Sequence, residues 1–292
     1  MTEAALRRGE AAGLEAVRRG LGSSTLHRTL FQIGIATGDL ELANEQVAWA
    51  AGKPEERQAT GWETGAAASA GQLRIAAGLR RRAVALAQRA GEDTAASAAA
   101  SDAFVLAVIG QCDAARAESA AAKTSTATAT VAAAGFTLGY CGDALSATAL
   151  ADRLLELYPR GTLEKHVHAP VIRAAAALPQ NPAQVLSLLE IARTFDRVAS
   201  FRTQYLRGQA YLRLSRGPEA SAEFQYILDH RGEDVLSVLY PLAYVGLARA
   251  ATLTGDTGKA RTAYETFFEM WKDADPDIPI LREARQEAAR LK

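Results

Sequence analysis

Two histidines, His166 and His168, are the residues of this chain that first suggest a metal ion. A zinc site takes three or four Cys, His or carboxylate ligands that converge on one point. Side chains two residues apart on a helix point in different directions, and no cysteine or carboxylate at ligand spacing joins this pair. We therefore predict no metal site, and expect partly exposed histidines at the start of a helix.

Three aspartates, Asp273, Asp275 and Asp277, imitate the opening of a calcium-binding loop. Such a loop needs a glycine at its sixth position for a sharp turn and a bidentate glutamate at its twelfth. This sequence has Ile278 and Ala284 at those positions. We expect a solvated linker here rather than a calcium site.

The motifs of common phosphate-transferring and hydrolytic enzymes are missing from the sequence. A kinase domain would need His-Arg-Asp and Asp-Phe-Gly, and the chain offers only His27-Arg28-Thr29 and His230-Arg231-Gly232. A Walker loop, a Gly-x-Ser-x-Gly elbow and a His-Glu-x-x-His helix do not occur either. We predict that the chain is not an enzyme, with no catalytic residues and no cofactor.

The two cysteines, Cys112 and Cys141, are too few for a disulfide framework, and neither lies in a Cys-x-x-Cys motif. Both stand in apolar surroundings, where cysteine behaves as a small buried side chain. We expect two buried thiols. A reducing, cytoplasmic location fits this expectation.

The charge balance argues against nucleic acid as a partner. The 33 basic and 33 acidic residues cancel, whereas nucleic-acid binding needs a clustered basic surface. The run Arg80-Arg81-Arg82 is read as a solvated helix face, with contact to an acidic partner as the alternative. The uncharged stretch 124–142 has few large apolar side chains, so we expect a buried helix and no membrane span.

A repeated pattern of small residues predicts the elements that must position any site. Alanine is abundant, and it has the highest helix propensity. One position, called the anchor of the repeat, recurs at spacings of 32 to 40 residues. The residue seven positions after each anchor is apolar, and the residue nine positions before it is small or apolar. Each unit should therefore pair two antiparallel helices that approach closely at small residues. The recurring anchor positions are Ala43, Ala76, Ala115, Ala147, Val185, Ala220 and Ala260.

Glycines mark the turn between the two helices of most units. Five residues before five of the anchors stands a glycine, at positions 38, 71, 110, 142 and 255. A glycine there predicts a left-handed residue that ends the first helix. Asp39, Asp143 and Asp256 follow three of these glycines and should cap the second helix. The remaining units use proline near the same entry, in Asn181-Pro182 and Gly217-Pro218.

The unit that begins at Tyr205 resembles a tetratricopeptide repeat (TPR). Residues 205–211, followed by Ala220 and Phe224, carry the small, aromatic and alanine positions of that family at its offsets. The resemblance extends over nearly the whole chain, although several units exceed the usual repeat length and should have longer connecting loops. It implies stacked helical hairpins whose first helices line a groove for peptide segments.

Three segments show a narrower resemblance. Residues 268–281, 227–232 and 49–56 are similar to repeat regions of certain bacterial proteins. In those proteins a eukaryotic-like serine/threonine kinase domain or a winged-helix regulator domain precedes the repeats. The resemblance implies the C-terminal docking or sensor region of a bacterial signalling protein.

We predict an all-α fold, a TPR-like solenoid of about seven antiparallel helical hairpins plus a C-terminal capping helix. Residues 1–22 are assigned to a remnant helix of a preceding repeat, because Leu14, Val17 and Leu21 suit the second helix of a unit. Residues 23–278 form the repeat array and residues 279–292 the capping helix. The chain is then expected to begin partway through an array.

In the TPR family, certain positions of the first helices face into the peptide-binding groove. Seven residues of this chain stand at such positions, and we predict that they bind a peptide. The arginines could pair with carboxylates, and the tyrosine could hold an apolar side chain. The alternative is that these residues solvate the groove or pack between units. The seven are Arg28, Gln32, Arg202, Tyr205, Gln209, Arg213 and Arg249.

Two functions follow from this reading. The first is a non-catalytic scaffold that binds a protein or peptide segment. The alternative is a helical solenoid that binds a small molecule or catalyses a reaction, which would need a deep pocket with converging polar groups. A further possibility is that the chain is a fragment of a serine/threonine protein kinase whose kinase domain lies upstream of it.

Overall fold

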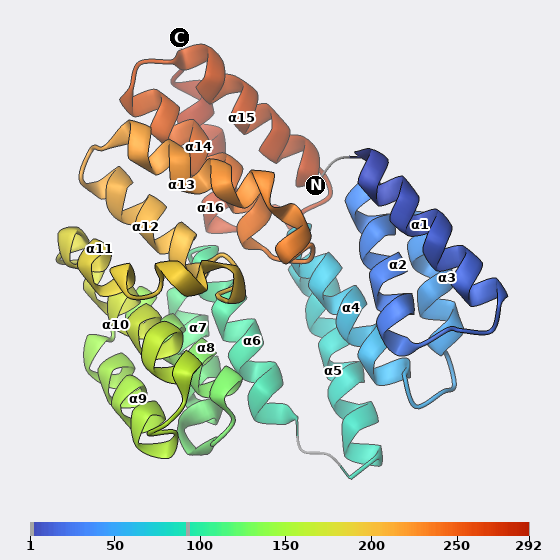
Figure 1. Cartoon of the computed structure of the whole chain (residues 1–292). Helices are drawn as coiled ribbons and strands as arrows, with labels where there is room; N and C mark the ends of the chain where they lie inside the picture. The colour runs from blue at the N-terminus through green and yellow to red at the C-terminus, as the bar shows by residue number, and fades with distance from the viewer. Residues whose placement is uncertain (1–2, 92–93, 292) are drawn as a thin grey trace. The chain divides into compact units, whose positions relative to one another are not determined.

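The structure, a computed structural model, describes residues 3–91 and 94–291. Every regular element in these two ranges is a helix, and the helices group into two compact units (Figure 1). Unit 1 comprises Met1–Asp93 and Asp229–Val238, and unit 2 comprises Thr94–Leu228 and Leu239–Lys292. This division was not predicted from the sequence.

Unit 1 contains two helical hairpins preceded by one helix. Helix α2 pairs with α3, α4 pairs with α5, and α1 packs on α2. The bounds are α1 (Glu3–Arg18), α2 (Ser24–Thr37), α3 (Leu40–Ala50), α4 (Glu56–Ser69) and α5 (Leu73–Arg89). The core of unit 1 includes Phe31, Ala43 and Trp62, and Leu236 of the inserted segment 229–238 packs against it.

Unit 2 contains five hairpins and a final helix. The pairs are α6 with α7, α8 with α9, α10 with α11, α12 with α13 and α14 with α15. The bounds are α6 (Ala95–Val108), α7 (Cys112–Ser119), α8 (Thr128–Tyr140), α9 (Ala144–Leu157), α10 (Ala169–Ala177), α11 (Pro182–Glu190), α12 (Arg202–Arg213), α13 (Gly217–Asp229), α14 (Leu239–Leu253), α15 (Thr257–Met270) and α16 (Pro279–Ala289). The prediction of an all-α fold with seven antiparallel helical hairpins and a C-terminal helix is confirmed for the described residues.

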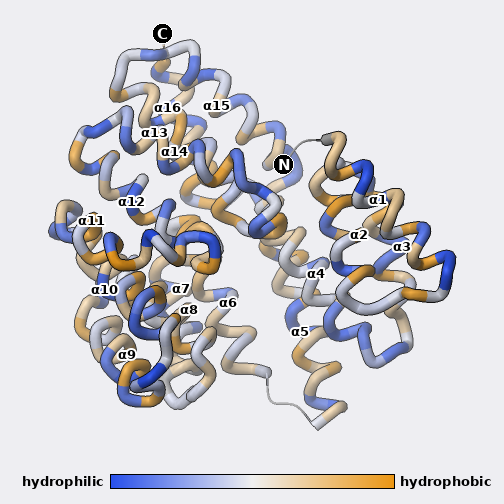
Figure 2. Tube along the Cα trace, in the orientation of Figure 1, coloured by the Kyte–Doolittle hydropathy of each residue, from blue (hydrophilic) through white to orange (hydrophobic). Residues whose placement is uncertain are grey.

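The anchor positions are buried in every hairpin. Each of the seven is at most 4% exposed. In the first hairpin, a Cβ atom placed on Gly34 of α2 would lie 3.1 Å from the Cβ of the anchor Ala43 on α3. The small residues therefore stand where the two helix backbones come closest. Figure 2 shows hydrophobic and hydrophilic residues mixed along each helix, as expected where one face is buried.

The turns between paired helices have the predicted left-handed residue. All five glycines of the turn column have positive φ, between 73° and 93°. In the sixth hairpin the same position is taken by Ser215, with φ of 56°. Five of these turns close with the same hydrogen bond, from the residue after the left-handed one to the carbonyl five residues earlier, as in a Schellman motif. The five donor–acceptor pairs are Gln72–Ala67, Gln111–Leu106, Asp143–Leu138, Arg216–Tyr211 and Asp256–Ala251.

Three aspartates cap the second helices as predicted. The side chains of Asp39, Asp143 and Asp256 accept hydrogen bonds from the backbone N–H groups three residues later. Asn181 caps α11 in the same way, directly before a proline at the first helical position. Aspartate and asparagine thus satisfy the same exposed amides at different hairpins.

A phenylalanine ring of unit 2 packs against glycines on two neighbouring helices. Phe224 of α13 is fully buried, and its ring reaches Gly208 of α12 and Gly246 of α14. A Cβ atom on Gly208 would lie 2.7 Å from the ring, and one on Gly246 would lie 2.5 Å from it. Only glycine leaves room for the ring at both positions.

The expectation of two buried thiols is wrong. Cys112, at the start of α7, and Cys141, directly after α8, form a disulfide with their Cα atoms 5.3 Å apart. The two cysteines lie beside the turns of neighbouring hairpins, at Gly110 and Gly142. Their sequence separation of 29 residues conceals this proximity, because the stacking of hairpins brings the two turns together.

Exchanging the residue types of two turns should change stability in opposite directions. Ser215→Gly should raise the free energy of unfolding by about 1 kcal/mol, because glycine adopts positive φ without steric cost. Gly142→Ala should lower it by about the same amount, since no atom lies near the added Cβ and only backbone strain acts. Denaturant unfolding measures both, and equal effects of one sign would contradict the assigned turn geometry.

The Phe224 contact makes a second prediction. Gly208→Ala should cost about 1–3 kcal/mol by overpacking, although alanine is the better helix former. Gly61→Ala is the matched control, because Gly61 is an exposed residue of α4 with open space around its Cα, and it should be neutral or stabilising. Phe224→Leu should reduce the cost of Gly208→Ala in a double-mutant cycle. Additive effects would show that the two residues do not touch.

Candidate functional site

The seven residues predicted to line a groove lie on three helices and in both units. Arg28 and Gln32 are on α2 of unit 1. The other five belong to unit 2, with Arg202, Tyr205, Gln209 and Arg213 on α12 and Arg249 on α14. The candidate site is therefore built on the five residues of unit 2.

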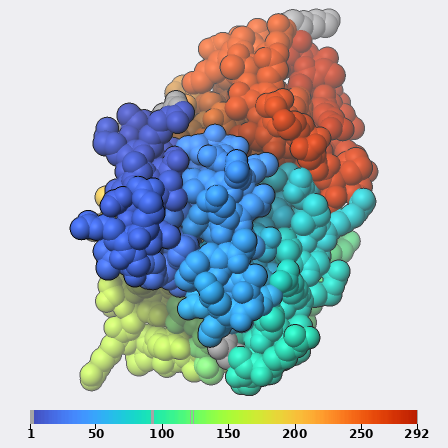
Figure 3. All heavy atoms as spheres, turned by 90° about the vertical axis from the view of Figure 1, so that its right-hand side faces the viewer, coloured from blue at the N-terminus to red at the C-terminus, as the bar shows by residue number. Residues whose placement is uncertain are grey.

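In unit 1, the two predicted residues lie one turn apart on α2. Arg28 is exposed and Gln32 is partly buried. The neighbouring His27 is buried instead, where its ring stacks on Trp49 at a centroid distance of 3.7 Å and its Nδ1 lies 2.8 Å from Gln46 Oε1. On the face that Figure 3 presents, the blue atoms of unit 1 form a continuous surface.

Tyr205 is part of the core of unit 2, which agrees with the alternative that these residues pack between hairpins. Its side chain is 2% exposed, and its ring packs on Tyr140 of α8 and edge-on against Phe224. Burial raises the pKa of Tyr205 well above its ordinary value, and the nearby Tyr140 hydroxyl adds to the rise. A partner cannot reach this ring without displacing other side chains.

Arg202 lies on the same helix as Tyr205 and contacts the first hairpin of unit 2. Its guanidinium lies over the ring of Phe104 on α6, 4.7 Å from the ring centroid, in a cation–π contact. It also acts on His168, because burial and the charge of Arg202 together lower the pKa of this histidine. The arginine is partly buried and holds α12 against α6. Gln209 is partly buried and Arg213 is exposed.

Arg249 is the centre of a polar cluster that joins α14, α15 and α16. Its Nε and Nη2 donate to the two carboxylate oxygens of Glu287, both at 2.9 Å, and Nη2 also reaches Glu283 at 3.3 Å. The Tyr264 hydroxyl donates to Glu287 at 2.5 Å. Burial raises the pKa of Glu287, but the hydrogen bonds from Arg249 and Tyr264 outweigh this effect and leave its pKa below the ordinary value.

Helix α16 joins the last hairpin of unit 2 to the first. Besides the contacts with Arg249 and Tyr264, the backbone N–H of Ile280 donates to the carbonyl of Ile109 at 3.2 Å. Pro279 lies against Gly110, in the turn between α6 and α7. The predicted capping helix thus packs on α15 and also contacts a turn more than 160 residues earlier in the chain.

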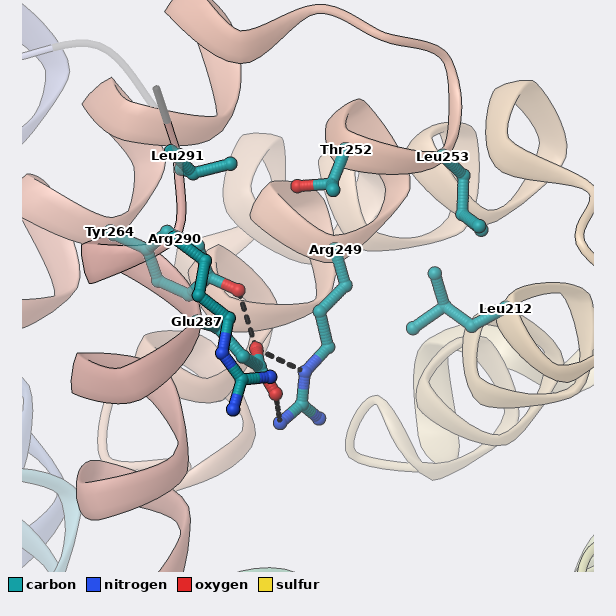
Figure 4. A pocket seen from close by; sticks show the side chains of 8 residues that line it. All are labelled: Leu212, Arg249, Thr252, Leu253, Tyr264, Glu287, Arg290 and Leu291. Atoms are coloured by element: carbon teal, nitrogen blue, oxygen red, sulfur yellow. Dashed lines mark hydrogen bonds and ion pairs between the residues drawn. The ribbon is translucent and has the colours of Figure 1, made fainter.

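A cavity of about 380 Å³ opens beside the last turn of α16. Figure 4 shows the Arg249–Glu287 pair on one side of it and aliphatic side chains on the other. Burial and the hydrogen bond to Glu287 raise the pKa of Tyr264, so this phenol stays protonated at neutral pH. The cavity is lined by Leu212, Arg249, Thr252, Leu253, Tyr264, Glu287, Arg290 and Leu291.

Arg207, which no sequence motif marks, forms a buried ionic cluster. Its side chain is 2% exposed and donates to Asp196 at 2.7 and 3.0 Å and to Glu223 at 2.8 Å. Asp196 lies in the short 3₁₀ helix Arg193–Val198 between α11 and α12, and Glu223 lies on α13. The cluster fixes this connection to the sixth hairpin, so we assign it a structural role.

The residues that first suggested metal ions are separate in the structure. The ring of His166 stacks on Phe195, at a centroid distance of 5.8 Å, whereas His168 is partly buried near Arg202. Among the described residues, no group of three or more His, Cys, Asp or Glu is placed to hold a metal ion. The helices of residues 3–91 and 94–291 include none whose length and hydropathy would let it span a membrane.

The lowered pKa of Glu287 predicts that the Arg249 cluster weakens in acid. A folded-state pKa below the unfolded one contributes stability above the unfolded pKa, and this contribution is lost as pH falls through the folded pKa. At pH 7 the wild-type chain should be more stable than Glu287→Gln, and the difference should shrink as pH falls below the ordinary range of carboxylates. Urea unfolding across pH measures this difference, with Glu265→Gln, an exposed carboxylate of α15, as control. A difference that does not change with pH would contradict the assignment.

Comparisons with known proteins add a weak likeness to a solved structure. No protein-family model and no curated protein matches the chain. A similar solved structure is the crystal structure of the P58(IPK) TPR domain at 2.5 Å, with 14% sequence identity, a TM-score of 0.32, and coverage of 98% of this chain and 93% of that one. This likeness is too low to carry a function from one protein to the other.

Proposed function

We propose that this chain is a non-catalytic scaffold that binds a segment of another protein. The observation that carries the proposal is the way unit 2 holds α16. A short amphipathic helix lies against this unit with Leu281 and Ala284 buried and Glu287 bound by Arg249. A surface that binds one helix in this manner has the features needed to bind a helix from elsewhere.

The chemistry of the surface supports a protein partner. Arg202, Arg213 and Arg249 place positive charge on the first helices of two hairpins, next to buried aromatic rings. Arginine with aromatic and aliphatic neighbours is typical of protein-binding surfaces, where it pairs with carboxylates. The chain as a whole has a formal net charge of zero, which favours protein over nucleic acid as the partner.

We place the scaffold in bacterial signalling, as the docking or sensor region that follows a kinase or winged-helix domain. The support is the resemblance of residues 268–281, 227–232 and 49–56 to such regions. A cytoplasmic location belongs to this proposal. The disulfide between Cys112 and Cys141 removes one of its supports, because stable disulfides are rare in reducing compartments.

A second candidate function is the binding of a small molecule. The cavity beside α16 favours it, since aliphatic walls with a few polar groups on one side are typical of ligand sites. A ligand of the cavity would stabilise the chain and shift its melting temperature. A small molecule that shifts the melting temperature, with the shift lost in Leu253→Ala, would favour this candidate.

A selection from a random peptide library tests the scaffold function. The full chain should enrich one sequence class, and Arg213→Glu should weaken the binding of that class at least tenfold, because Arg213 is exposed on the proposed surface. Arg261→Glu, an exposed arginine of α15, is the matched control and should have little effect. If the selection enriches no class, or both variants bind as the wild type does, the proposal is wrong.

A further inference from the structure

We infer that the site occupied by α16 is an exchangeable docking site for an acidic amphipathic helix of a partner protein. This inference rests on the proposed function and specifies its partner. In the chain as described, α16 occupies the site itself, so the partner must compete with it. The site has three parts: an apolar contact, a charge contact and a contact at the start of the helix.

The apolar contact is small. Ile280, Leu281 and Ala284 of α16 are at most 9% exposed, and Ile278 just before the helix is fully buried. These residues follow the spacing of a single helix face. The helix has only 11 residues, a length that is marginal for a helix without packing contacts. The docking of α16 therefore depends on few side chains.

The charge contact selects acidic residues one turn apart. Arg249 pairs with Glu283 and Glu287, which are four residues apart and so lie on the same side of α16. Glu283 is 57% exposed and Glu287 is 33% exposed, so water screens both pairs. Ion pairs of this kind contribute little to stability but restrict which sequences fit.

The contact at the start of the helix sets its direction. The N–H of Ile280 is one of the first amides of α16, which have no partner within the helix, and the carbonyl of Ile109 accepts from it. Pro279 occupies the first helical position, where its missing N–H is not needed, and rests on Gly110. A partner helix should therefore begin at the turn between α6 and α7 and end near α14.

The cavity beside the last turn of α16 provides a reason for exchange. Leu212, Leu253 and Leu291 form its aliphatic part, and α16 leaves it unfilled. A partner helix with the same pattern and a large apolar residue in one further turn could fill this space. Such a helix would bury apolar surface that α16 does not, and would bind more tightly than α16.

A labelled peptide tests this inference on the full chain. The peptide has the sequence of residues 279–291, and its binding is followed by fluorescence anisotropy. The chain variant Glu283→Arg/Glu287→Arg should release α16, because both substitutions place positive charge beside Arg249. This variant should bind the peptide at least tenfold more tightly than the wild-type chain does.

Charge reversal provides the matched control. Adding Arg249→Glu to the releasing variant should abolish binding of the wild-type peptide. A peptide with Glu283→Arg and Glu287→Arg would have to compete with the equally reversed α16 of a chain that carries all three substitutions. The matched chain for this peptide is therefore the Arg249→Glu single variant. That single variant should bind the reversed peptide and not the wild-type peptide.

The outcomes separate the inference from the proposed function. Equal peptide binding by the wild type and the releasing variant, or binding that ignores Arg249→Glu, would overturn the inference. If the releasing variant does not fold by circular dichroism, Glu283→Gln/Glu287→Gln replaces it, with the same expected direction. A library selection could instead enrich peptides that do not resemble α16 and whose binding depends on Arg213. That result would support the scaffold function and refute the docking site of α16.

Discussion

The close approach of paired helices is the constraint on which the rest of the structure depends. The backbones of two helices can pack in close contact only where the side chain between them is absent or very small. Gly34 facing Ala43 shows this within a hairpin, and Gly139 of α8 facing the backbone of Ala176 on α10 shows it between hairpins. The left-handed turn residues serve the same end, because they reverse the chain within a few residues and bring the second helix back against the first.

The candidate site is a consequence of this packing. Because the first helices of unit 2 lie close together, Tyr140 of α8 reaches Tyr205 of α12, and Arg202 of α12 reaches Phe104 of α6. The aromatic side chains that could have faced a partner are thereby used to pack neighbouring hairpins. The residues left for binding are arginines, and one of them, Arg249, already binds carboxylates of α16.

The features that were predictable from the sequence are local ones. The turn glycines, the aspartate caps and the anchor positions each depend on residues within about one helical turn or one hairpin, so their spacing carries the information. The position of Ser215 in the turn column could have been predicted by the same register, although serine seldom adopts positive φ.

The features that were missed join residues far apart in the chain. The disulfide spans 29 residues and the Arg249–Glu287 pair spans 38, and neither spacing has a local signature. The role of Tyr205 was left open for a related reason, because an aromatic residue on the inner face of a repeat suits a groove and a core equally well. Arg207 offered no signal either, since its partners Asp196 and Glu223 come from two different elements.

A leucine placed at two neighbouring positions of α9 tests the central claim most directly. Ala147 is a fully buried anchor, whereas Ala149 on the same helix is exposed. Denaturant unfolding should show that Ala147→Leu lowers the free energy of unfolding by at least about 1 kcal/mol, while Ala149→Leu changes it by less than about 0.5 kcal/mol. Equal effects of the two substitutions would contradict close helix packing at the anchor positions.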